Sequence, residues 1–339
     1  MDRDIIIPVW NQLTFTKDCI DSILKNTDSN VEYRLIMIDN ASDSRTAAYL
    51  ETLKSVTGLK VLVLRNENNL GFVKAVNQGI KASSAPYLCI LNNDTLVAKD
   101  WLKIMVDVAK RDKNIGIVNP SSNNLGQRPD KGEPVEFYAG KIAKDADKFV
   151  ELGAAIGFCM LIKKDVIDRI GLFDEIYGMG NFEDTDYSRR AIKEGYKCVR
   201  ACGAYVYHRE NSSFRTVKTF DDDFRRNKEI FEFRWGKPKR VAYTLDSYDV
   251  NILLRLKLNS LRLARGGDWV WYFEKGDVDI PEHSNIRAVK IFSKRFYIDT
   301  VLKILTKKKK FDEIFVGGER FGKVLEALSF IHKAKVSYY

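Results

Sequence analysis

The sequence predicts an α/β protein, with a doubly wound, mostly parallel sheet followed by a second and smaller Rossmann-like α/β unit. Short apolar runs alternate with amphipathic stretches from residue 4 onward, as strands alternate with helices in such sheets. Polar clusters of short side chains follow several of these runs, where the chain leaves a strand. The 339 residues are 45% hydrophobic and 30% charged, which is typical of a globular chain with one large domain or two smaller ones.

The first part of the chain repeats a strand and a helix, and this repeat predicts a parallel sheet. We expect strands at 4–9, 33–38, 61–64 and 86–91, and helices at 14–26, 44–56, 71–83 and 98–110. Parallel strands need a long crossover connection, which is usually a helix, so the alternation indicates βαβ units.

The segment 119–150 breaks the pattern, because prolines, glycines and charged residues punctuate it. We expect a long loop with one short strand, and such loops are often functional. The elements expected after it are a buried strand at 153–162, helices at 165–170 and 184–195, a strand at 199–206 and a helix at 222–234. The polar stretch 209–226 is expected to be mobile.

The composition changes near Gly236-Lys237-Pro238, and we divide the chain there into domains 1–236 and 237–339. The second domain is predicted to contain strands at 241–245, 269–273, 286–291, 313–316 and 335–339, with helices at 250–265, 297–306 and 319–332. It stops on a strand, which leaves a parallel sheet unfinished. We therefore expect this unit to be truncated and the chain to be a fragment of a longer protein.

Positive charge is concentrated in the second domain. Residues 237–339 carry 21 Lys/Arg and 12 Asp/Glu, a net charge of +9, whereas 1–236 carry only +1 of the total of +10. The densest run is Lys307–Lys310, which fits either a solvated loop or an anionic partner such as a membrane surface. Aromatic and basic residues are not interleaved as on nucleic-acid-binding surfaces, so no nucleic-acid partner is expected.

The cysteine spacing and the length of the apolar segments bear on the cellular location of the protein. The five cysteines lack the spacing of a disulfide framework, and no second Cys or His pair completes a zinc site beside Cys198 and Cys202. No apolar run approaches the roughly 18 residues of a membrane span, and Met1–Asp4 does not begin a signal peptide. We expect a cytoplasmic protein, with peripheral contact at the inner face of the membrane through its basic part.

Two expected strands end in polar clusters, Asp39-Asn40-Ala41-Ser42 and Asn92-Asn93-Asp94-Thr95. Ligands of open α/β sheets bind at the carboxyl ends of the strands, so these clusters predict one crevice for a nucleotide and a divalent cation. Asp94 can bind Mg²⁺ or Mn²⁺, and His208 is a candidate second ligand that favours Mn²⁺. A helix N-cap for Asp94 and an ordinary strand-end histidine for His208 remain alternatives.

A third cluster, Glu183-Asp184-Thr185-Asp186, places three acids at the start of an expected helix. Helix capping explains one or two of them. Like charges this close raise the pKa of one carboxyl, which suits a general base. The turn Asn68–Phe72 opens another helix with free amides, and Lys74 is placed to meet a phosphate. The glycine patterns of ordinary kinases and dehydrogenases are absent.

The order of these clusters resembles that of the family 2 inverting glycosyltransferases of the GT-A fold. The motifs that carry the resemblance are Ile-Pro-Val-Trp-Asn at 7–11, Asp-Asn-Ala-Ser at 39–42, Asn-Asn-Leu-Gly-Phe at 68–72, Asn-Asn-Asp-Thr at 92–95 and Glu-Asp-Thr-Asp at 183–186. The resemblance covers about residues 4–235. It implies a bacterial surface-glycan or protein-glycosylating enzyme that uses a UDP- or dTDP-sugar and an acceptor on a glycan, a lipid-linked glycan or a protein.

The resemblance also implies roles for individual residues. Asp184 would be the catalytic base with Glu183 beside it, and Asp186 would orient the acceptor or brace the helix. Asp94 matches the last acid of the Asp-x-Asp metal motif, with Asn92 in place of the first, and His208 would complete a Mn²⁺ or Mg²⁺ site. The expected nucleotide-sugar-binding residues are Pro8, Asp39, Asn40, Asn69, Gly71, Lys74 and Asn93. The segments 121–148 and 209–226 would close over the donor.

Other functions remain open on the sequence. A sugar-phosphate nucleotidyltransferase would carry a Gly-rich basic loop after the first strand, where this chain has Pro8–Gln12. A non-catalytic protein that binds a nucleotide sugar or glycan is compatible with Asn92 in place of an acid. The joint presence of Asp94, Asp184 and His208 argues against that alternative. The second domain loosely resembles the opening of a nucleotide-sugar-binding GT-B half.

Overall fold

The computed structural model describes residues 2–28, 30–209, 220–246 and 249–339. The contact pattern divides the chain into two compact units. The N-terminal unit comprises Met1–Val150 and Ala154–Trp235, and the C-terminal unit comprises Glu151–Gly153 and Gly236–Tyr339. The predicted mobility of 209–226, and its closure over a donor, fall mainly on 210–219, outside the described residues.

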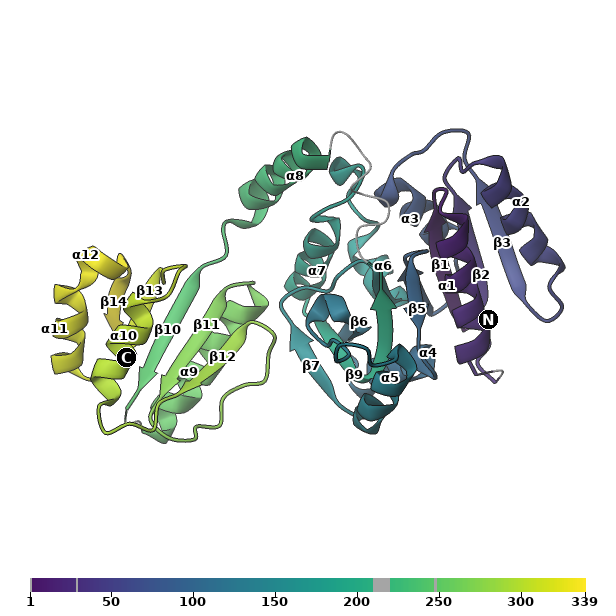
Figure 1. The fold of residues 1–339 in the computed structure, drawn as a ribbon. Coiled ribbons are helices and arrows are strands. Elements are labelled where there is room, and N and C mark those ends of the chain that lie inside the picture. Colours follow the sequence, from purple (N-terminus) through teal and green to yellow (C-terminus); the bar gives the residue numbers. More distant parts are fainter. Residues whose placement is uncertain (1, 29, 210–219, 247–248) are drawn as a thin grey trace. The chain divides into compact units, whose positions relative to one another are not determined.

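The N-terminal unit is built on a sheet whose strands, among the described residues, follow the order β3-β2-β1-β4-β8-β6-β9-β5, with β7 paired to β9 (Figure 1). Its strands are β1 (Arg3–Val9), β2 (Arg34–Asp39), β3 (Lys60–Arg65), β4 (Tyr87–Leu91), β5 (Thr95–Val97), β6 (Ile115–Ser121), β7 (Phe149–Leu152), β8 (Cys159–Lys163) and β9 (Lys197–His208). Its α-helices are α1 (Leu13–Asn26), α2 (Ser44–Thr52), α3 (Phe72–Lys81), α4 (Trp101–Arg111), α5 (Val135–Ile142), α6 (Lys164–Ile170), α7 (Glu183–Lys193) and α8 (Phe220–Trp235). Short 3₁₀ turns lie at Leu53–Ser55, Asn123–Leu125, Ala143–Asp145 and Glu175–Tyr177.

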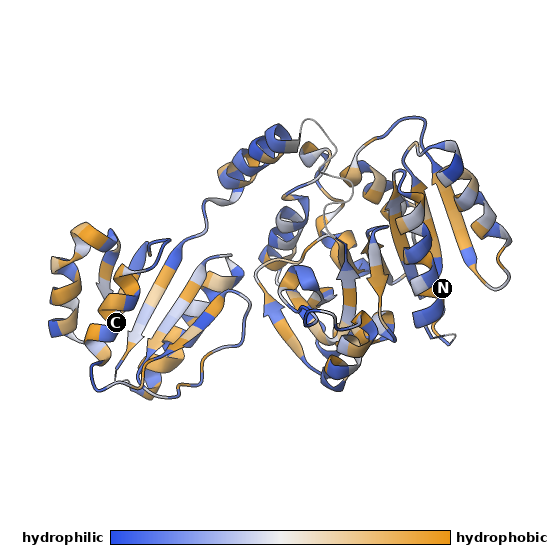
Figure 2. Cartoon of the chain, in the orientation of Figure 1, coloured by the Kyte–Doolittle hydropathy of each residue, from blue (hydrophilic) through white to orange (hydrophobic). Residues whose placement is uncertain are grey.

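The first four strands are parallel, as the sequence predicts. β1 pairs with β2 and with β4, and β2 pairs with β3, all in parallel register. Helices on the sheet bury apolar residues on both of its faces, which is why these strands are apolar runs rather than alternating ones. Figure 2 shows this hydrophobic colouring along the strands and polar colouring on α2 and α8.

The second half of the sheet differs from the prediction. β8 is antiparallel to β4 and β6, and β5 is antiparallel to β9. The expected long loop at 119–150 contains the end of the buried strand β6, the helix α5 and the strand β7. The polar residues Asn119 and Ser121 make this part of the sequence resemble an exposed loop. Both are fully buried in β6, where they have hydrogen-bond partners inside the unit.

The expected strand 153–162 is also shorter than predicted. Only Cys159–Lys163 forms a strand, and the residues before it form a turn. The Asn119 side chain explains this, because its amide donates to Ile156 O and its oxygen accepts from Ile156 N, both at 2.8 Å. These bonds replace the strand pairing of the backbone there.

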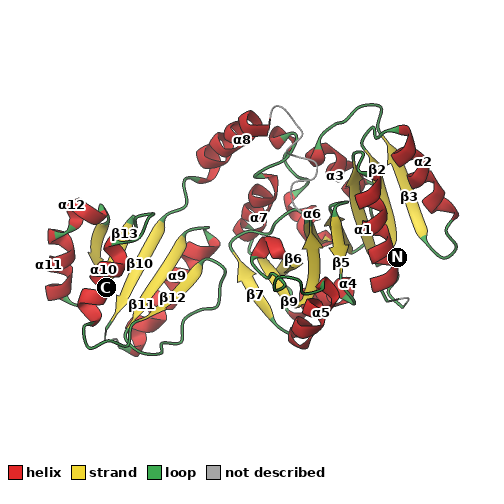
Figure 3. Ribbon diagram, in the orientation of Figure 1, coloured by secondary structure: helices red, strands yellow, loops and turns green. Residues whose placement is uncertain are grey.

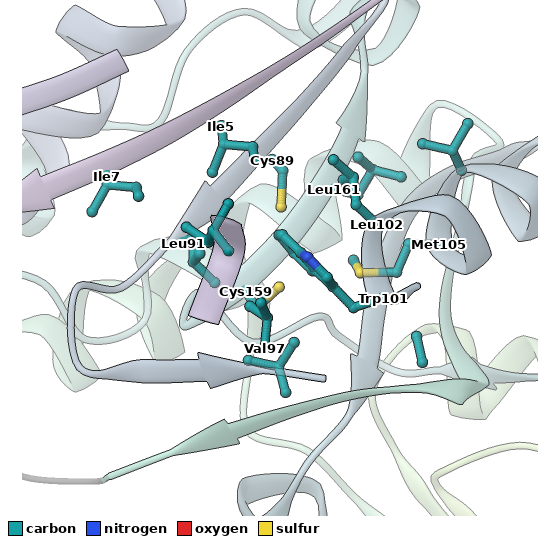
Figure 4. Close-up of a cluster of buried hydrophobic side chains, with 14 of the residues drawn as sticks. Ile5, Ile7, Cys89, Leu91, Val97, Trp101, Leu102, Met105, Cys159 and Leu161 are labelled. Carbon is teal, nitrogen blue, oxygen red and sulfur yellow. The ribbon is translucent and has the colours of Figure 1, made fainter. Parts of the chain in front are cut away.

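The core of the N-terminal unit lies between the sheet and α4. Trp101 is fully buried, and Figure 4 shows it among Cys89, Leu91, Cys159 and Leu161. Its indole Nε1 donates to Thr27 Oγ1 over 3.1 Å, so the polar atom of this large side chain is satisfied.

The C-terminal unit has its own parallel sheet in the order β12-β11-β10-β13-β14 (Figure 3). Its strands are β10 (Arg240–Leu245), β11 (Trp269–Glu274), β12 (Ile286–Lys290), β13 (Glu313–Val316) and β14 (Lys335–Tyr338), and its helices are α9 (Val250–Arg265), α10 (Phe296–Leu305), α11 (Glu319–Ala327) and α12 (Ser329–His332). Alternate strand residues belong to two separate apolar clusters, one under α9 and one under α10 and α11. The fold class predicted from the sequence is confirmed in both units.

Within the residues that the structure describes, no helix is both long and apolar enough to cross a bilayer.

Candidate active site

Two of the three polar clusters, the one after β4 and the one at the start of α7, contribute to the wall of a cavity of about 330 Å³ in the N-terminal unit. Its wall comes from the turn after β4, the turn before β8, the start of α7 and the end of β9, and it includes Asn92, Phe158, Glu183, Asp184 and His208. Residues from distant parts of the sequence therefore share one site, because β8 and β6 bring β9 into the sheet that β4 began.

Asp94 and His208 form the centre of this site. Asp94 Oδ1 lies 3.0 Å from His208 Nε2, and both side chains are largely buried. The antiparallel pairing of Thr95 with His208 in β5 and β9 produces this approach, and Arg209 N donates to Asp94 O at the same place. Asp94 and His208, which the sequence analysis gives as candidate ligands of one cation, are therefore in direct contact.

The orientation of His208 is fixed by residues that the sequence analysis did not identify. Asn123 Oδ1 accepts from His208 N over 2.9 Å, and Asn123 Nδ2 donates to His208 O over 2.8 Å. The Asn124 amide contacts Nδ1, and the Phe158 ring stacks on the imidazole with 5.3 Å between centroids. These residues lie inside the expected loop 119–150 and the expected strand 153–162, where nothing local in the sequence marks them.

Glu183 and Asp184 begin α7 on another wall of the cavity. Asp184 Oδ2 accepts from Gly157 N over 2.9 Å, and Oδ1 accepts from Thr185 N over 2.6 Å. Glu183 is only 6% exposed, and its Oε2 atom has no hydrogen-bond partner among the described atoms. A buried carboxylate oxygen without a partner is costly, and such exceptions often mark a functional site.

Burial changes the acidity of both carboxyls. It raises the pKa of Glu183 well above its usual range, and the neighbouring charge of Asp184 raises it further. Burial also raises the pKa of Asp184, against hydrogen bonds from Gly157 and Thr185 that lower it. Both groups therefore hold a proton more tightly than an ordinary carboxyl, which is the property of a general base.

Asp186 does not face the cavity, and this corrects its predicted acceptor role. Its side chain is fully buried and accepts from Arg190 Nε at 3.0 Å, and from Arg234 and Trp235 Nε1 at 2.8 Å each. Asp186 thus ties α8 to α7. The bracing role that the sequence analysis gave as the alternative is the one the structure supports.

The loops after β2 and β3 are joined by side-chain hydrogen bonds. Asp39 pairs with Arg65, and its Oδ1 accepts from Ser42 N over 2.8 Å. Asn40 Nδ2 donates to Asn69 Oδ1 over 2.6 Å, and Asn40 Oδ1 accepts from Leu70 N over 2.9 Å. The two predicted nucleotide-binding loops therefore form one rigid ledge, with Asp39 and Asn40 buried beneath its surface.

Gly71 and Asn93 are placed by close packing. Gly71 has a φ of +83°, and a Cβ there would lie 2.9 Å from Gly178 O, so only glycine fits. Asn93 Nδ2 donates to Thr16 Oγ1 over 2.9 Å, and the side chain is buried. Asn93 therefore braces α1, and its predicted contact with the donor stays a prediction.

Two of the predicted donor-binding residues, Pro8 and Lys74, are at least partly exposed to solvent. Pro8 is half-buried in β1 opposite Ile38 of β2. Lys74 lies in the first turn of α3, and its side chain is exposed.

The donor atoms at the centre of the site fit a divalent cation. The 3.0 Å between Asp94 Oδ1 and His208 Nε2 is close to the separation of adjacent ligands around an octahedral ion with bonds of ~2.1 Å. Asn92 Oδ1 is buried nearby without a hydrogen-bond partner among the described atoms. The described residues contain no group of three or more His, Cys, Asp or Glu side chains around one point, so water and phosphate would supply the remaining ligands.

One side chain must turn for this site to accept a cation. Nε2 of His208 binds a metal only when it carries no proton, which places the proton on Nδ1. The neighbour of Nδ1 is the Asn124 amide, which presents its nitrogen there. A half-turn of that amide would present its oxygen and stabilise the required tautomer.

Part of this chain is similar to known glycosyltransferases. Residues 4–171 match the family model described as Glycosyl transferase family 2. The glycosyltransferase AglE of Haloferax volcanii is 22% identical over 260 residues, which cover 75% of this chain and 78% of AglE. A poly-beta-1,6-N-acetyl-D-glucosamine synthase of Staphylococcus aureus is 27% identical over 183 residues, covering 50% of this chain and 44% of the synthase.

Several relatives are longer than the matched part. The protein y4gI of Sinorhizobium fredii is 26% identical over 272 residues, which cover 74% of this chain and only 29% of y4gI. This chain thus spans less than a third of that relative.

Solved structures share the fold at low identity. The structure of GalNAc-T7 with UDP, GalNAc and Mn²⁺ has a TM-score of 0.55 and 16% identity, covering 68% of this chain and 48% of that one. The structure of S. aureus TarS 1-349 with UDP-GlcNAc has a TM-score of 0.52 and 15% identity, covering 69% and 66%. Residues 4–171 of this chain therefore match the model of glycosyl transferase family 2, and the unit that contains them has the GT-A fold.

Proposed function

We propose that the N-terminal unit is an inverting glycosyltransferase that moves a sugar from a nucleoside-diphosphate donor to an acceptor hydroxyl. The carrying observation is that the Asp184 carboxylate shares one cavity with His208, which is paired to Asp94. The proposal is supported because a candidate base, a candidate cation-binding pair and room for a sugar lie together at the strand ends, where α/β sheets bind ligands.

The donor would lie along the edge formed by the ends of β1, β2 and β4. We propose that the ledge of Asp39, Asn40, Asn69 and Gly71 supports the nucleoside through its backbone, with Pro8 beside it. A UDP- or dTDP-sugar is favoured by the resemblance of these motifs to the family. The Mn²⁺ in the GalNAc-T7 structure supports a divalent cation in this class of fold.

Asp94 and His208 would hold that cation, Mn²⁺ or Mg²⁺. When bound, it would offset the negative charge that develops on the departing diphosphate. Lys74, exposed in the first turn of α3, would add a positive charge to the same anion.

Asp184 would remove the proton from the attacking hydroxyl. The amides of Gly157 and Thr185 keep its carboxylate in one orientation, while burial keeps its pKa raised. The hydroxyl oxygen forms the new bond to the anomeric carbon as the bond to the diphosphate breaks on the opposite face, so the configuration inverts. Glu183, which shares this wall, would help keep the proton within the pair.

The acceptor is proposed at the level of its chemistry, a hydroxyl on a glycan, a lipid-linked glycan or a protein. The S. aureus relative is named as a polysaccharide synthase, which supports a glycan acceptor of a bacterial surface type. We further propose a cytoplasmic location with peripheral contact at the inner face of the membrane.

Thermal stabilisation by ligands tests the donor and the cation together. UDP, dTDP, GDP and CMP are each added with Mn²⁺, with Mg²⁺ and with chelator, because a ligand of the native state raises the melting temperature. We expect a cation-dependent rise with UDP or dTDP that Asp94→Asn removes. Asp107→Asn on the exposed face of α4 is the matched control and should keep the rise.

Two results would redirect the proposal. If no nucleotide shifts the melting temperature, the donor site is wrong. If nucleotides bind but no UDP- or dTDP-sugar is consumed with any glycan acceptor, the non-catalytic alternative, which Asn92 in place of an acid keeps open, becomes the better function.

A further inference from the structure

The N-terminal unit has a second cavity, of about 630 Å³, beside the candidate active site. Its wall comes from β5, the end of β9, the segment after the 3₁₀ turn Asn123–Leu125 and the start of α5, which packs near β9 (Figure 1). We call it the β5–β9 cavity. His208 contributes to the walls of both cavities. The predicted donor-binding residues, all of which the structure describes, do not line the β5–β9 cavity, so it is open to a different ligand.

A hydrogen-bond donor and an acceptor stand close together in the sequence on the rim of this cavity. Arg128 Nε donates to Asn123 O over 3.3 Å, and its two terminal nitrogens make no hydrogen bond or ion pair with the described residues. Asp130 N donates to Glu133 Oε2 over 2.9 Å, and the Asp130 carboxylate is likewise unpaired within the described ranges. Both side chains are exposed. An unpaired guanidinium and an unpaired carboxylate therefore border one cavity.

The other charged residues of the wall already have partners. Glu133 forms an ion pair with Lys141. Arg209 pairs with Asp18 over 2.7 Å, and its guanidinium lies over the ring of Phe15. The two unpaired groups on the rim have opposite charges, so the cavity does not select a ligand for a net charge of either sign.

The segment that carries Arg128 and Asp130 is held in place by the protein. Gln127 N donates to Ser122 O, and the hydroxyl of the buried Tyr205 donates to Gln127 O, both over 3.0 Å. A ligand therefore meets a rim whose backbone is already ordered, and less conformational freedom is lost on binding.

This combination of groups matches an uncharged sugar unit. A sugar hydroxyl both donates and accepts hydrogen bonds, as a serine hydroxyl does, so it fits a guanidinium placed beside a carboxylate. The C–H face of a sugar ring is apolar, and Leu96, Val135 and the ring of Tyr207 supply an apolar wall. A peptide is usually bound along a strand edge or a long groove. Here the binding groups are side chains around one compact cavity.

His208 joins this cavity to the proposed reaction. The Asn123 side chain bonds to both N and O of His208, and the Asn123 carbonyl accepts from Arg128. The reacting hydroxyl has to reach Asp184, which lines the first cavity and not the second. A ligand that fills both cavities therefore passes His208 and extends beyond a single sugar.

We propose that the β5–β9 cavity binds an uncharged sugar unit of the acceptor, next to the unit that carries the reacting hydroxyl. The acceptor is then a glycan chain of at least two sugars. Naming this glycan the acceptor rests on the proposed function, whereas its binding in the β5–β9 cavity does not.

Glycan binding by the full chain, with chelator and without a donor, tests the cavity. The labelled chain is applied to an array of uncharged glycans from single sugars to hexasaccharides, and the affinity for the best of them is measured by NMR titration. We expect oligosaccharides to bind more tightly than single sugars, with little effect of salt. Arg128→Ala should lower the affinity about tenfold, because it removes the hydrogen-bond donors of the rim.

A second substitution distinguishes a sugar from an anion. Asp130→Asn replaces a charged acceptor with a weaker neutral one, so the affinity for an uncharged glycan should fall about threefold. The same change would strengthen the binding of an anion, because it removes a repelling charge. Lys131→Ala with Glu136→Ala is the matched control, since both residues are exposed near the same segment but outside the cavity wall, and binding should be unchanged. Equal melting temperatures without ligand would show that all variants fold.

Several outcomes would overturn the proposal. Retention of no glycan would remove the sugar as the ligand, and retention of peptides instead would assign the cavity to a protein acceptor. An unchanged affinity in Arg128→Ala, or an equal loss in the control variant, would place the glycan elsewhere. Tighter binding of a phosphorylated glycan by Asp130→Asn would assign the cavity to an anion. If the glycan binds as expected but no sugar is transferred to it, the cavity assignment stands and the proposed reaction fails.

Discussion

Two regions at the same edge of the first sheet use similar residues in opposite ways. In the ledge after β2 and β3, Asp39 and Asn40 are surrounded by protein partners that occupy their oxygens and amides. In the cavity at the end of β9, Glu183 and Asn92 each keep a buried oxygen without a hydrogen-bond partner among the described atoms. Polar residues with complete sets of partners hold the backbone, while those left incomplete are available for chemistry.

The substitution with the largest expected effect is in the cavity at the end of β9 and tests its proposed role in catalysis. Asp184→Asn should lower kcat by about a thousandfold, because the amide keeps the shape but cannot take a proton. The affinity for the nucleotide should change less than about threefold, since the contacts of the donor remain. Initial rates with saturating donor and binding by calorimetry measure the two quantities.

Asp168→Asn, an exposed acid on α6, serves as the control for that substitution. A kcat for Asp184→Asn within tenfold of the unchanged protein would remove Asp184 as the base.

The second effect concerns the cation. Asp94→Ala should weaken binding of a nucleoside diphosphate in Mn²⁺ by about a hundredfold, while binding in chelator should be unchanged, because only the contribution of the cation is lost. Asn124→Ala should cause a smaller loss of about tenfold, since it frees the His208 ring without removing a ligand. Titration calorimetry with and without Mn²⁺ gives both values, and equal losses in chelator would contradict the metal assignment.

A substitution in the ledge should lower the free energy of unfolding more than it lowers kcat. Asn40→Ala removes several hydrogen bonds, among them those with Asn69 Oδ1 and Leu70 N, so we expect a loss of about 2–3 kcal/mol in the free energy of unfolding. The kcat at saturating donor should fall less than tenfold. Urea denaturation and initial rates provide the test, and a loss in kcat like that of Asp184→Asn would erase the distinction between the two regions.

The smallest expected effect is that of replacing Glu183, and this substitution should stabilise the protein rather than destabilise it. Its pKa is raised in the folded protein, so the folded state binds the proton more tightly than the unfolded state. The stability this gives is complete below the unfolded pKa and is lost as the pH rises through the folded pKa. Glu183→Gln should therefore stabilise the protein at pH 7 by about 1 kcal/mol, since a tenfold change in proton affinity corresponds to about 1.4 kcal/mol.

At a pH near 3 the same substitution should have almost no effect, because both states of the unchanged protein then carry the proton on Glu183. Thermal unfolding at the two pH values decides the matter. A stabilisation that is equal at both would show that packing, not charge, limits this site.

The sequence predicts the first half of the fold better than the second for a physical reason. Each βα unit from β1 to β4 is a local pattern of apolar runs and helices, and its partner is the next strand in line. β8 instead inserts between β4 and β6 in the antiparallel sense, and β6 carries buried Asn119, whose partners lie in the turn before β8. Such pairings depend on contacts that no local window contains.

The site follows the same division. Asp94, Asp184 and His208 stand out because each ends a strand or begins a helix, where ligand-binding residues gather. Asn123, Gly157 and Phe158 act only through what they contact in space, so the sequence analysis missed them. For Asp186 the sequence leaves both the acceptor role and the bracing role open, because its partners on α8 are far away in sequence.

The pairing of β5 with β9 has a consequence for how the protein is made. β5 comes early in the sequence, but among the described residues the strand that pairs with it is β9. Every element from α4 to α7 lies between the two in the sequence. A nascent chain that has not yet emerged as far as Tyr207 can form the parallel strands around β1, but it cannot hold Asp94 in place. Closing so long a segment is entropically slow, so this corner forms late in folding. Any ligand that engages Asp94 and His208 together thus stabilises only the finished unit and gives no help to a partly synthesised one.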